Sequence, residues 1–352
     1  MRIRTTLATV TAAVTAVALP AAAQAPGPAA AAPPSRACSP HVRIDGYGDG
    51  LDKTAFDGSY VGNLSALAAD TDGTVAALSD RSRLFALDVR RGPTAARPVR
   101  ARALADEQGG ALDAEALAVD RDGTRLVASE TEPSVRRHAR DGTLLGRLPV
   151  PGALRPAPAG RALPNQTFEG LTLRPGGRGL LAAMEGPLAG DGRMVRFQSW
   201  ERSRTGPGTP EFRLGRQYGY PVDPGLGVSE VTEAGDGRLL VLERGFTPGE
   251  GNTVRLYVAD ARGASDTSGV ETLPGGPGTR PVRKRLLADL GECPSLGAPA
   301  KQPQTNPLLD NIEGLAVLGR VPGGRLRLLL VSDDNESVRQ TTRLYALTAR
   351  LP

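Results

Sequence analysis

Carboxylates recur at fixed places in this 352-residue chain and are its clearest candidates for chemistry. In the stretch NQTFEGLTLRPGGRGLLAAMEGP, residues 165–187, Glu169 opens one apolar run and Glu185 closes the next. A Gly-Gly turn separates the two runs, which is typical of a β-hairpin. The start of one hairpin strand lies beside the end of the other, so we expect both carboxylates at the same end.

The same pattern occurs five times. The copies begin at Leu64, Ala114, Phe168, Ser229 and Ile312. The positions that open the first run are Ser65, Glu115, Glu169, Glu230 and Glu313. The positions that close the second run are Asp80, Glu130, Glu185, Glu243 and Asp333. Nine of these ten residues are acidic, so the repeats predict a ring of carboxylates around one point.

Such a ring needs cations or protons to offset its repulsion, and hard oxygen ligands suit Ca²⁺. The expected metal ligands are Glu115, Glu169, Glu230, Glu313 and Asp333. The expected catalytic residues are Glu169, Glu185, Glu243 and Glu313. Arg81 and Arg244, which follow closing carboxylates, are expected to bind an anionic substrate. Residues that can complete the site are Asn311, Asp334 and Asn335.

Two other interpretations of the ring stay open. Each Glu can instead accept hydrogen bonds from backbone amides of a neighbouring repeat and lock the repeats together. Alternatively, coupled carboxylates can act as general acid and base, which requires one raised pKa.

The elements that must position these residues are strands. A third apolar run follows each hairpin, at residues 83–89, 134–139, 194–200, 254–260 and 342–347. A fourth follows in four copies, at residues 99–104, 143–150, 211–218 and 282–290. A strand-like run at residues 41–47 can supply the fourth strand that the last copy lacks.

Four-stranded units repeated radially make a β-propeller. We therefore predict an all-β propeller with five recognisable blades, the last one closed by the N-terminal strand. Six blades remain possible because the interval between Glu230 and Glu313 is long.

The first 25 residues are typical of a secretory signal, with Arg2 and Arg4 before a short apolar run. Residues 26–37 are predicted to be a disordered Ala/Pro-rich lead, and residues 38–352 the propeller domain. No later run is apolar enough to span a membrane, so a secreted protein is expected. An oxidising compartment favours a disulfide between Cys38 and Cys293 that pins the N-terminal strand.

Several function classes are excluded by composition and motifs. The net charge is only +5, or +3 once Arg2 and Arg4 are removed, and aromatic residues make up 4% of the chain, which argues against nucleic-acid binding. His41 and His138 are the only histidines, and no G-x-S-x-G, HExxH or P-loop motif occurs. A Ser-His-Asp hydrolase, a zinc peptidase and a nucleotide hydrolase are therefore not expected.

The strand openings FEGL, IEGLAV and EALAV, with the closings MEGP, LERG and SDDN, resemble the phytase-like family called "esterase-like activity of phytase". The resemblance covers roughly residues 62–347. It implies a secreted propeller with ester or phosphoester hydrolase activity at the acidic positions. Ser65 departs from the acidic pattern. The matching residues are Glu115, Glu169, Glu185, Glu230, Glu243, Glu313 and Asp333.

The favoured function is a Ca²⁺-dependent hydrolase of a small-molecule ester or phosphoester. The alternatives are a secreted propeller that binds a ligand or partner and uses calcium structurally, and a lactonase-type hydrolase. The sequence predicts no oligomeric state.

Overall fold

The structure is a computed structural model that describes residues 35–203 and 211–352. Within this range, residues 36–352 form one compact unit. The predicted signal peptide and most of the predicted lead fall at residues 1–34, outside the described residues. No helix in the described part of the chain is long and apolar enough to cross a membrane.

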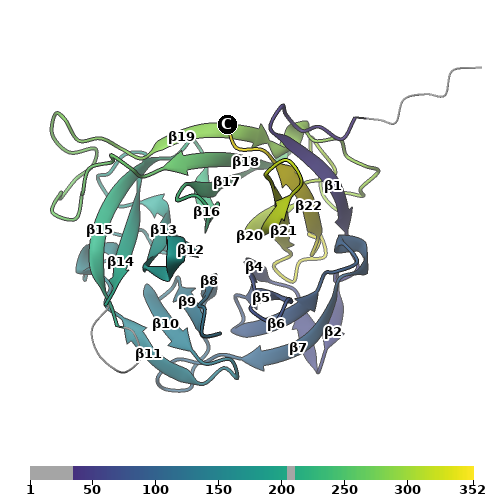
Figure 1. Ribbon diagram of the computed structural model, residues 1–352, viewed down its shortest axis with the longest axis horizontal. Coiled ribbons are helices and arrows are strands. Elements are labelled where there is room, and N and C mark those ends of the chain that lie inside the picture. Colours follow the sequence, from purple (N-terminus) through teal and green to yellow (C-terminus); the bar gives the residue numbers. More distant parts are fainter. Residues whose placement is uncertain (1–34, 204–210) are drawn as a thin grey trace, which may run out of the picture. The chain divides into compact units, whose positions relative to one another are not determined.

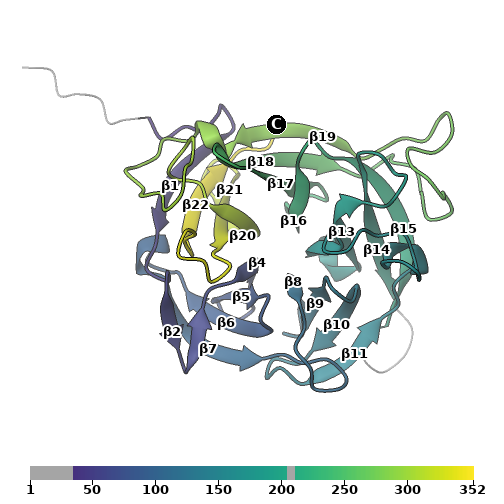
Figure 2. The same cartoon turned by 180° about the vertical axis from the view of Figure 1, so that it is seen from behind.

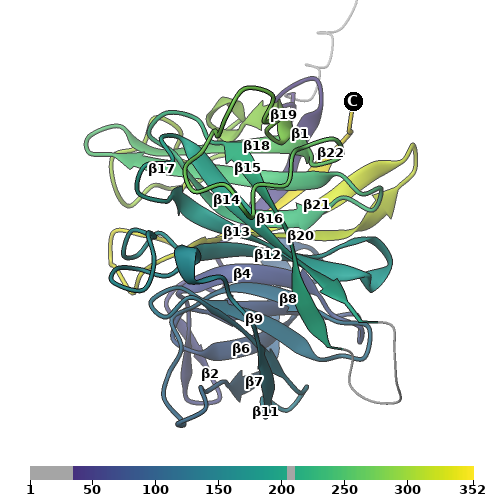
Figure 3. The same ribbon diagram turned by 90° about the vertical axis from the view of Figure 1, so that its left-hand side faces the viewer.

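Five four-stranded antiparallel sheets stand radially around a central axis, which confirms the predicted all-β propeller (Figure 1). The same arrangement is seen from behind in Figure 2. Seen from the side, the inner strands β4 (Leu64–Ala69) and β12 (Phe168–Leu173) run roughly along that axis (Figure 3). The described residues contain five such sheets and no sixth.

Each blade follows the order of the sequence from the axis outwards. Blade 1 consists of β4, β5 (Val75–Ser79), β6 (Arg83–Asp88) and β7 (Arg97–Ala103). Blade 2 consists of β8 (Ala114–Val119), β9 (Arg125–Ser129), β10 (Ser134–His138) and β11 (Leu144–Leu148). Blade 3 consists of β12, β13 (Gly179–Pro187), β14 (Met194–Arg202) and β15 (Phe212–Pro221). Blade 4 consists of β16 (Gly227–Glu233), β17 (Leu239–Thr247), β18 (Gly251–Asp260) and β19 (Arg283–Asp289).

The fifth sheet combines the two ends of the described chain. It contains β20 (Asn311–Val321), β21 (Arg325–Asp333), β22 (Leu344–Ala349) and β1 (Val42–Gly48). β1 pairs antiparallel with β22 as the outermost strand. The remaining elements are a small hairpin, β2 (Thr54–Phe56) with β3 (Ser59–Val61), and the single 3₁₀ turns η1 (Pro93–Ala95), η2 (Gly152–Leu154), η3 (Pro175–Gly177) and η4 (Leu290–Glu292).

Glycines next to the acidic openings allow the inner strands to approach closely. A Cβ on Gly170 would lie 2.6 Å from the backbone nitrogen of Val231 in β16. A Cβ on Gly314 would lie 3.0 Å from the backbone of Ala66 and Leu67 in β4. The Glu-Gly-Leu motif therefore has a steric reason, because a side chain at the glycine would separate neighbouring blades.

The disulfide predicted between Cys38 and Cys293 is confirmed. It joins the segment before β1 to the end of η4, which follows blade 4. The Ser39 hydroxyl donates to the carbonyl oxygen of Leu287 at 2.6 Å beside it. Both cysteines are buried in the core shared by blades 4 and 5, so the link holds β1 against its neighbours.

Replacing both cysteines with serine should destabilise the protein and loosen β1 first. The disulfide spans 255 residues of sequence, and the chain-entropy model gives about 5 to 6 kcal/mol for a loop of this size. We expect the double variant to have a lower denaturation midpoint than the unsubstituted protein. Within the variant, we expect amide hydrogen exchange to increase more in β1 than in β21. Equal midpoints and unchanged β1 exchange in the double variant would show that the link is not stabilising.

Candidate functional site

A one-residue bulge near the start of every inner strand sets which side chains face the axis. The bulged residues are Ser65, Glu115, Glu169, Ser229 and Glu313. The residue before each bulge pairs with a residue on the second strand of the same blade. The residue that follows this partner in the sequence is the closing position; in blade 1, for example, Leu64 pairs with Ser79 and Asp80 follows. The closing positions are Asp80, Glu130, Glu185, Arg244 and Asp333.

Blade 4 is therefore offset by one residue from the alignment that the sequence suggested. Val228 pairs with Glu243, and the bulge falls on Ser229 and not on Glu230. A shift of one residue turns a strand side chain to the opposite face. The expectation that Glu230 and Glu243 join the ring is wrong for this reason, and Ser229 and Arg244 occupy the corresponding places.

The ring opens into a cavity of about 650 Å³ at one end of the channel. Its charged lining residues are eight carboxylates and one guanidinium: Asp80, Asp113, Glu115, Glu130, Glu169, Glu185, Glu313, Asp333 and Arg244. Its other lining residues are Asn165, Gln166, Phe246, Asn252, Gln302, Asn311, Asn335 and Gln340. Glu169 and Glu313 face this cavity together, as the repeats predicted.

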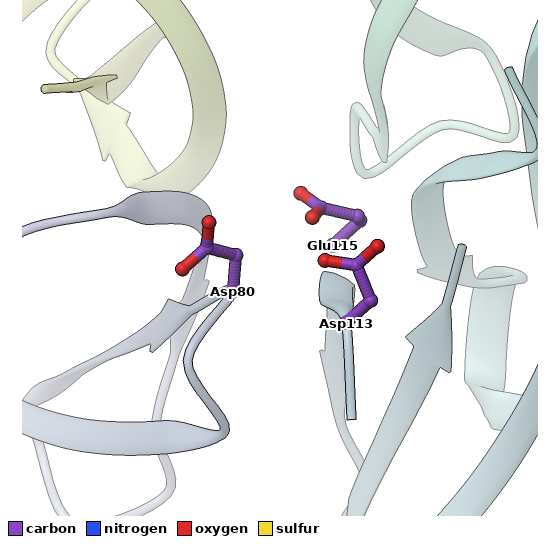
Figure 4. A group of neighbouring side chains, drawn as sticks. All are labelled: Asp80, Asp113 and Glu115. Atoms are coloured by element: carbon purple, nitrogen blue, oxygen red, sulfur yellow. The ribbon is translucent and has the colours of Figure 1, made fainter. Parts of the chain in front are cut away.

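Two groups of three carboxylates bring their oxygens together within this cavity. In one group Asp80, directly after β5 of blade 1, faces Asp113 and Glu115 at the start of blade 2 (Figure 4). The other group combines Glu130 of blade 2 with Glu169 and Glu185 of blade 3. Within each group the ligand oxygens lie within 4.8 Å of one another.

This geometry fits hard divalent cations. Oxygens 2.3–2.6 Å from a Ca²⁺ ion on opposite sides are about 5 Å apart, so oxygens within 4.8 Å of one another are close enough to share one ion. In the second group the buried oxygen Glu169 Oε2 has no hydrogen-bond partner among the described residues, whereas Asp80 Oδ1 of the first group lies 3.6 Å from Arg81 Nε. A buried acceptor without a partner is costly, so the second group is the better suited of the two to receive a ligand.

Arg244 stands between the second group and the last blade. Its Nη2 lies 3.0 Å from Glu313 Oε1 and 3.6 Å from Glu185 Oε1. Asn311 Nδ2 also donates to Glu313 Oε1 at 2.9 Å. Burial alone would lower the pKa of Arg244, but the charges of Glu313 and Glu185 raise it above its ordinary value.

Burial and mutual repulsion favour protonated carboxyl groups in the cavity. Burial raises the pKa of Glu130 to about 7, and the charge of Glu185 adds to the effect. Burial raises the pKa of Glu313 to about 7 despite the nearby Arg244. It also raises that of Asp80 to about 6. The pKa is raised, again first by burial, in Glu115, Glu169, Glu185 and Asp333.

Glu230 and Glu243 are buried away from this cavity and have structural partners. Glu230 Oε1 accepts from the backbone nitrogens of Val231 at 2.9 Å and Leu171, in blade 3, at 3.3 Å. Glu230 therefore matches the interpretation of ring carboxylates as links between blades. Glu243 accepts from the Tyr220 hydroxyl at 2.6 Å and pairs with Lys284.

Two other expected residues also lie outside the cavity lining. The Arg81 side chain is 67% exposed and lies 3.6 Å from Asp80 and 3.8 Å from Glu336. Asp334 points to Lys53 and accepts from the backbone nitrogen of Asn63 at 2.9 Å.

Sequence reasoning missed Asp113, Phe246 and Asn252. Asp113 lies two residues before Glu115, a spacing that places side chains on one side of an extended chain, so this signal was available. Phe246 and Asn252 face the cavity only because β17 and β18 extend beyond the repeat pattern.

Comparison with known proteins gives one family match. Residues 59–336 match the phytase-like family model described as "Esterase-like activity of phytase". No curated protein sequence matches.

Three solved structures show distant similarity to this chain. A Dyadobacter fermentans protein of unknown function has 14% identity and a TM-score of 0.45, covering 89% of this chain and 100% of its own. The aldose sugar dehydrogenase of Streptomyces coelicolor in its PQQ-bound form has 12% identity and a TM-score of 0.40, covering 90% and 100%. A streptogramin B lyase has 10% identity and a TM-score of 0.36, covering 82% and 94%. At these scores the similarities carry no functional inference.

Replacing Glu130 with glutamine should stabilise the chelator-treated protein at high pH. The pKa of Glu130 rises from 4.5 to about 7 on folding, so its stability contribution is full below 4.5 and lost as pH rises through 7. We expect a gain over the unsubstituted protein of roughly 2 to 3 kcal/mol at pH 8. Thermal midpoints measured in EDTA from pH 5.5 to 8 check this.

Comparing Glu130→Gln with the unsubstituted protein also cancels the pH-dependent stability contributions of the other titratable groups. Burial lowers the pKa of His138, which makes its contribution opposite in sign, but this contribution is common to both proteins. A variant that is equally or less stable at pH 8 would contradict the raised pKa.

Proposed function

The chain belongs to the phytase-like family described as esterase-like activity of phytase, and we propose that it is a Ca²⁺-dependent hydrolase of esters or phosphoesters. The observation that carries the proposal is the pair of three-carboxylate groups in one cavity with a guanidinium, together with the buried and unpartnered Glu169 Oε2 in the second group. Carboxylates alone would repel a phosphate group, so hydrolysis of a phosphoester here requires cations.

The groups Asp80–Asp113–Glu115 and Glu130–Glu169–Glu185 are the residues that would hold calcium. Calcium bound there would lower the pKa of a coordinated water and polarise the substrate oxygen. The amide side chains of Asn165 and Asn335, which also line the cavity, can supply further oxygen ligands.

Arg244 and Glu313 are the charged residues that we assign to the substrate. The Arg244 guanidinium is held by Glu313 and Glu185 and can bind the anionic oxygen that develops on the carbonyl or phosphoryl group. Glu313 belongs to neither three-carboxylate group and is fixed by Arg244 and Asn311. It can accept a proton from the attacking water or return one to the leaving group.

Secretion is part of the proposal. The Cys38–Cys293 disulfide is consistent with an oxidising compartment, where such bonds persist. Extracellular calcium would also be available there to occupy the carboxylate groups.

Calcium should raise the thermal midpoint of the protein after chelator treatment. A ligand present at 100 times its Kd adds about 2.7 kcal/mol per site by linkage. Glu169→Gln should remove much of this gain, because Glu169 belongs to one three-carboxylate group and has an unpartnered oxygen. Calorimetric titration and thermal unfolding measure both effects.

The matched control is Glu271→Gln, which neutralises an exposed loop carboxylate that does not line the cavity. This variant should respond to calcium like the unsubstituted protein. Identical midpoints in calcium and in EDTA would rule out the metal part of the proposal.

Arg244→Met should lower kcat/KM by about 100-fold while calcium stabilisation is retained. Loss of one donor to a developing oxyanion typically costs a factor of 100 to 1,000. The assay uses p-nitrophenyl phosphate, bis(p-nitrophenyl) phosphate and a lactone in the presence of calcium. Arg238→Met, at a surface arginine paired with Asp236, is the control.

Calcium binding without turnover of any of these substrates would favour the alternative of a propeller that binds a ligand. Turnover that Arg244→Met leaves unchanged would remove Arg244 from the mechanism but not the carboxylate groups.

A further inference from the structure

We propose that the β17–β18 hairpin recognises a substrate that carries a ring and a single anionic group, and that the cavity discriminates against substrates with several phosphates. This inference rests on the hydrolase function proposed above and narrows its substrate class.

The hairpin places three different side chains on one wall of the cavity. Arg244 and Phe246 come from β17, and Asn252 comes from β18, where it pairs with Phe246 in the sheet. Two buried donors on this wall, Arg244 Nε and Asn252 Nδ2, have no partner among the described residues. A buried donor without a partner is costly, so the wall is suited to accept oxygen atoms of a ligand.

Phe246 adds an apolar surface beside these donors. It is 53% exposed and is the one aromatic residue among the exposed large hydrophobics of the described chain. The other cavity-lining residues are polar or charged, which leaves Phe246 as the apolar contact. The face of a phenylalanine ring packs well against an aromatic ring or the apolar face of a sugar. A ring next to the scissile group would meet Phe246 while its anionic oxygen meets Arg244.

The charge of the cavity lining limits how many anionic groups a bound substrate can carry. Eight carboxylates and one guanidinium line the cavity, and each phosphate brings a charge of about −1.5 to −2 at neutral pH. The six carboxylates of the two groups carry six negative charges when they hold two divalent cations, and these cations together with Arg244 supply five positive charges. A first anionic group has Arg244 and the cations as partners. A second has no further cationic side chain among the described lining residues.

Uncharged polar groups of the substrate, in contrast, have many partners. Carboxamides line the cavity at Asn165, Gln166, Gln302 and Gln340, in addition to Asn252. Each carboxamide offers both donors and an acceptor, which suits hydroxyl groups. The lining therefore favours hydroxyl-bearing ring compounds over polyanions.

Binding of three non-hydrolysable phosphonates to the full chain tests this inference. Methylphosphonate, phenylphosphonate and 1,4-phenylenediphosphonate are titrated calorimetrically at pH 7 in excess calcium. We expect phenylphosphonate to bind about tenfold more tightly than methylphosphonate, because of the ring contact, and more tightly than the diphosphonate. Phe246→Ala should remove the preference for phenylphosphonate over methylphosphonate, whereas Arg244→Met should weaken both.

Two further measurements separate this inference from the proposed function. Phe246→Ala should bind calcium like the unsubstituted protein, and Leu214→Ala, at an exposed leucine of β15 outside the cavity, should leave all three affinities unchanged. If calcium binding and hydrolysis hold but the diphosphonate binds as tightly as phenylphosphonate, or Phe246→Ala keeps the ring preference, the inference is overturned. If the ring preference holds without calcium binding or turnover, the recognition wall is supported and the hydrolase function is not.

Discussion

Repulsion among carboxylates is the constraint on which this structure depends. Eight of them line one cavity with a single guanidinium, and burial raises the pKa of seven, with the charge of neighbouring carboxylates adding to the effect in six of these. Such a site is stable only if protons or cations neutralise part of the charge. Ligand binding in the cavity and the stability of the channel are therefore coupled.

Close packing between the inner strands of neighbouring blades holds the carboxylates in place despite this repulsion. Gly170 and Gly314 let the inner strands approach one another, and Glu230 links blades 3 and 4 through backbone amides. Glu243 and Lys284 form a separate buried pair with Tyr220 behind the same wall. These contacts hold β17 in place, and with it Arg244, whose positive charge offsets part of the repulsion among the carboxylates.

The offset in blade 4 breaks the symmetry of the ring and gives the cavity two sides. Blades 1, 2, 3 and 5 each supply a carboxylate at the closing position, whereas blade 4 supplies Arg244. The two three-carboxylate groups lie where blade 1 meets blade 2 and where blade 2 meets blade 3. Arg244, Phe246 and Asn252 lie on the β17–β18 hairpin of blade 4. A ring with five equivalent acidic sectors would hold cations but would have no obvious position for a substrate.

The sequence by itself predicted an all-β propeller with five recognisable blades and favoured the Cys38–Cys293 pairing, because turn residues, strand periods and two cysteines are local or countable signals. The structure decided between five and six blades and contains the disulfide. It also identified most of the acidic ring. Tertiary structure alone decided which face each blade 4 residue takes, since a single bulge at Ser229 sets the register through inter-strand hydrogen bonds. The sequence alignment matched Glu230 with Glu169 and Glu243 with Glu185, whereas backbone pairing matches Ser229 with Glu169 and Arg244 with Glu185. One residue of register thus exchanges two expected carboxylates for the only guanidinium among the described lining residues.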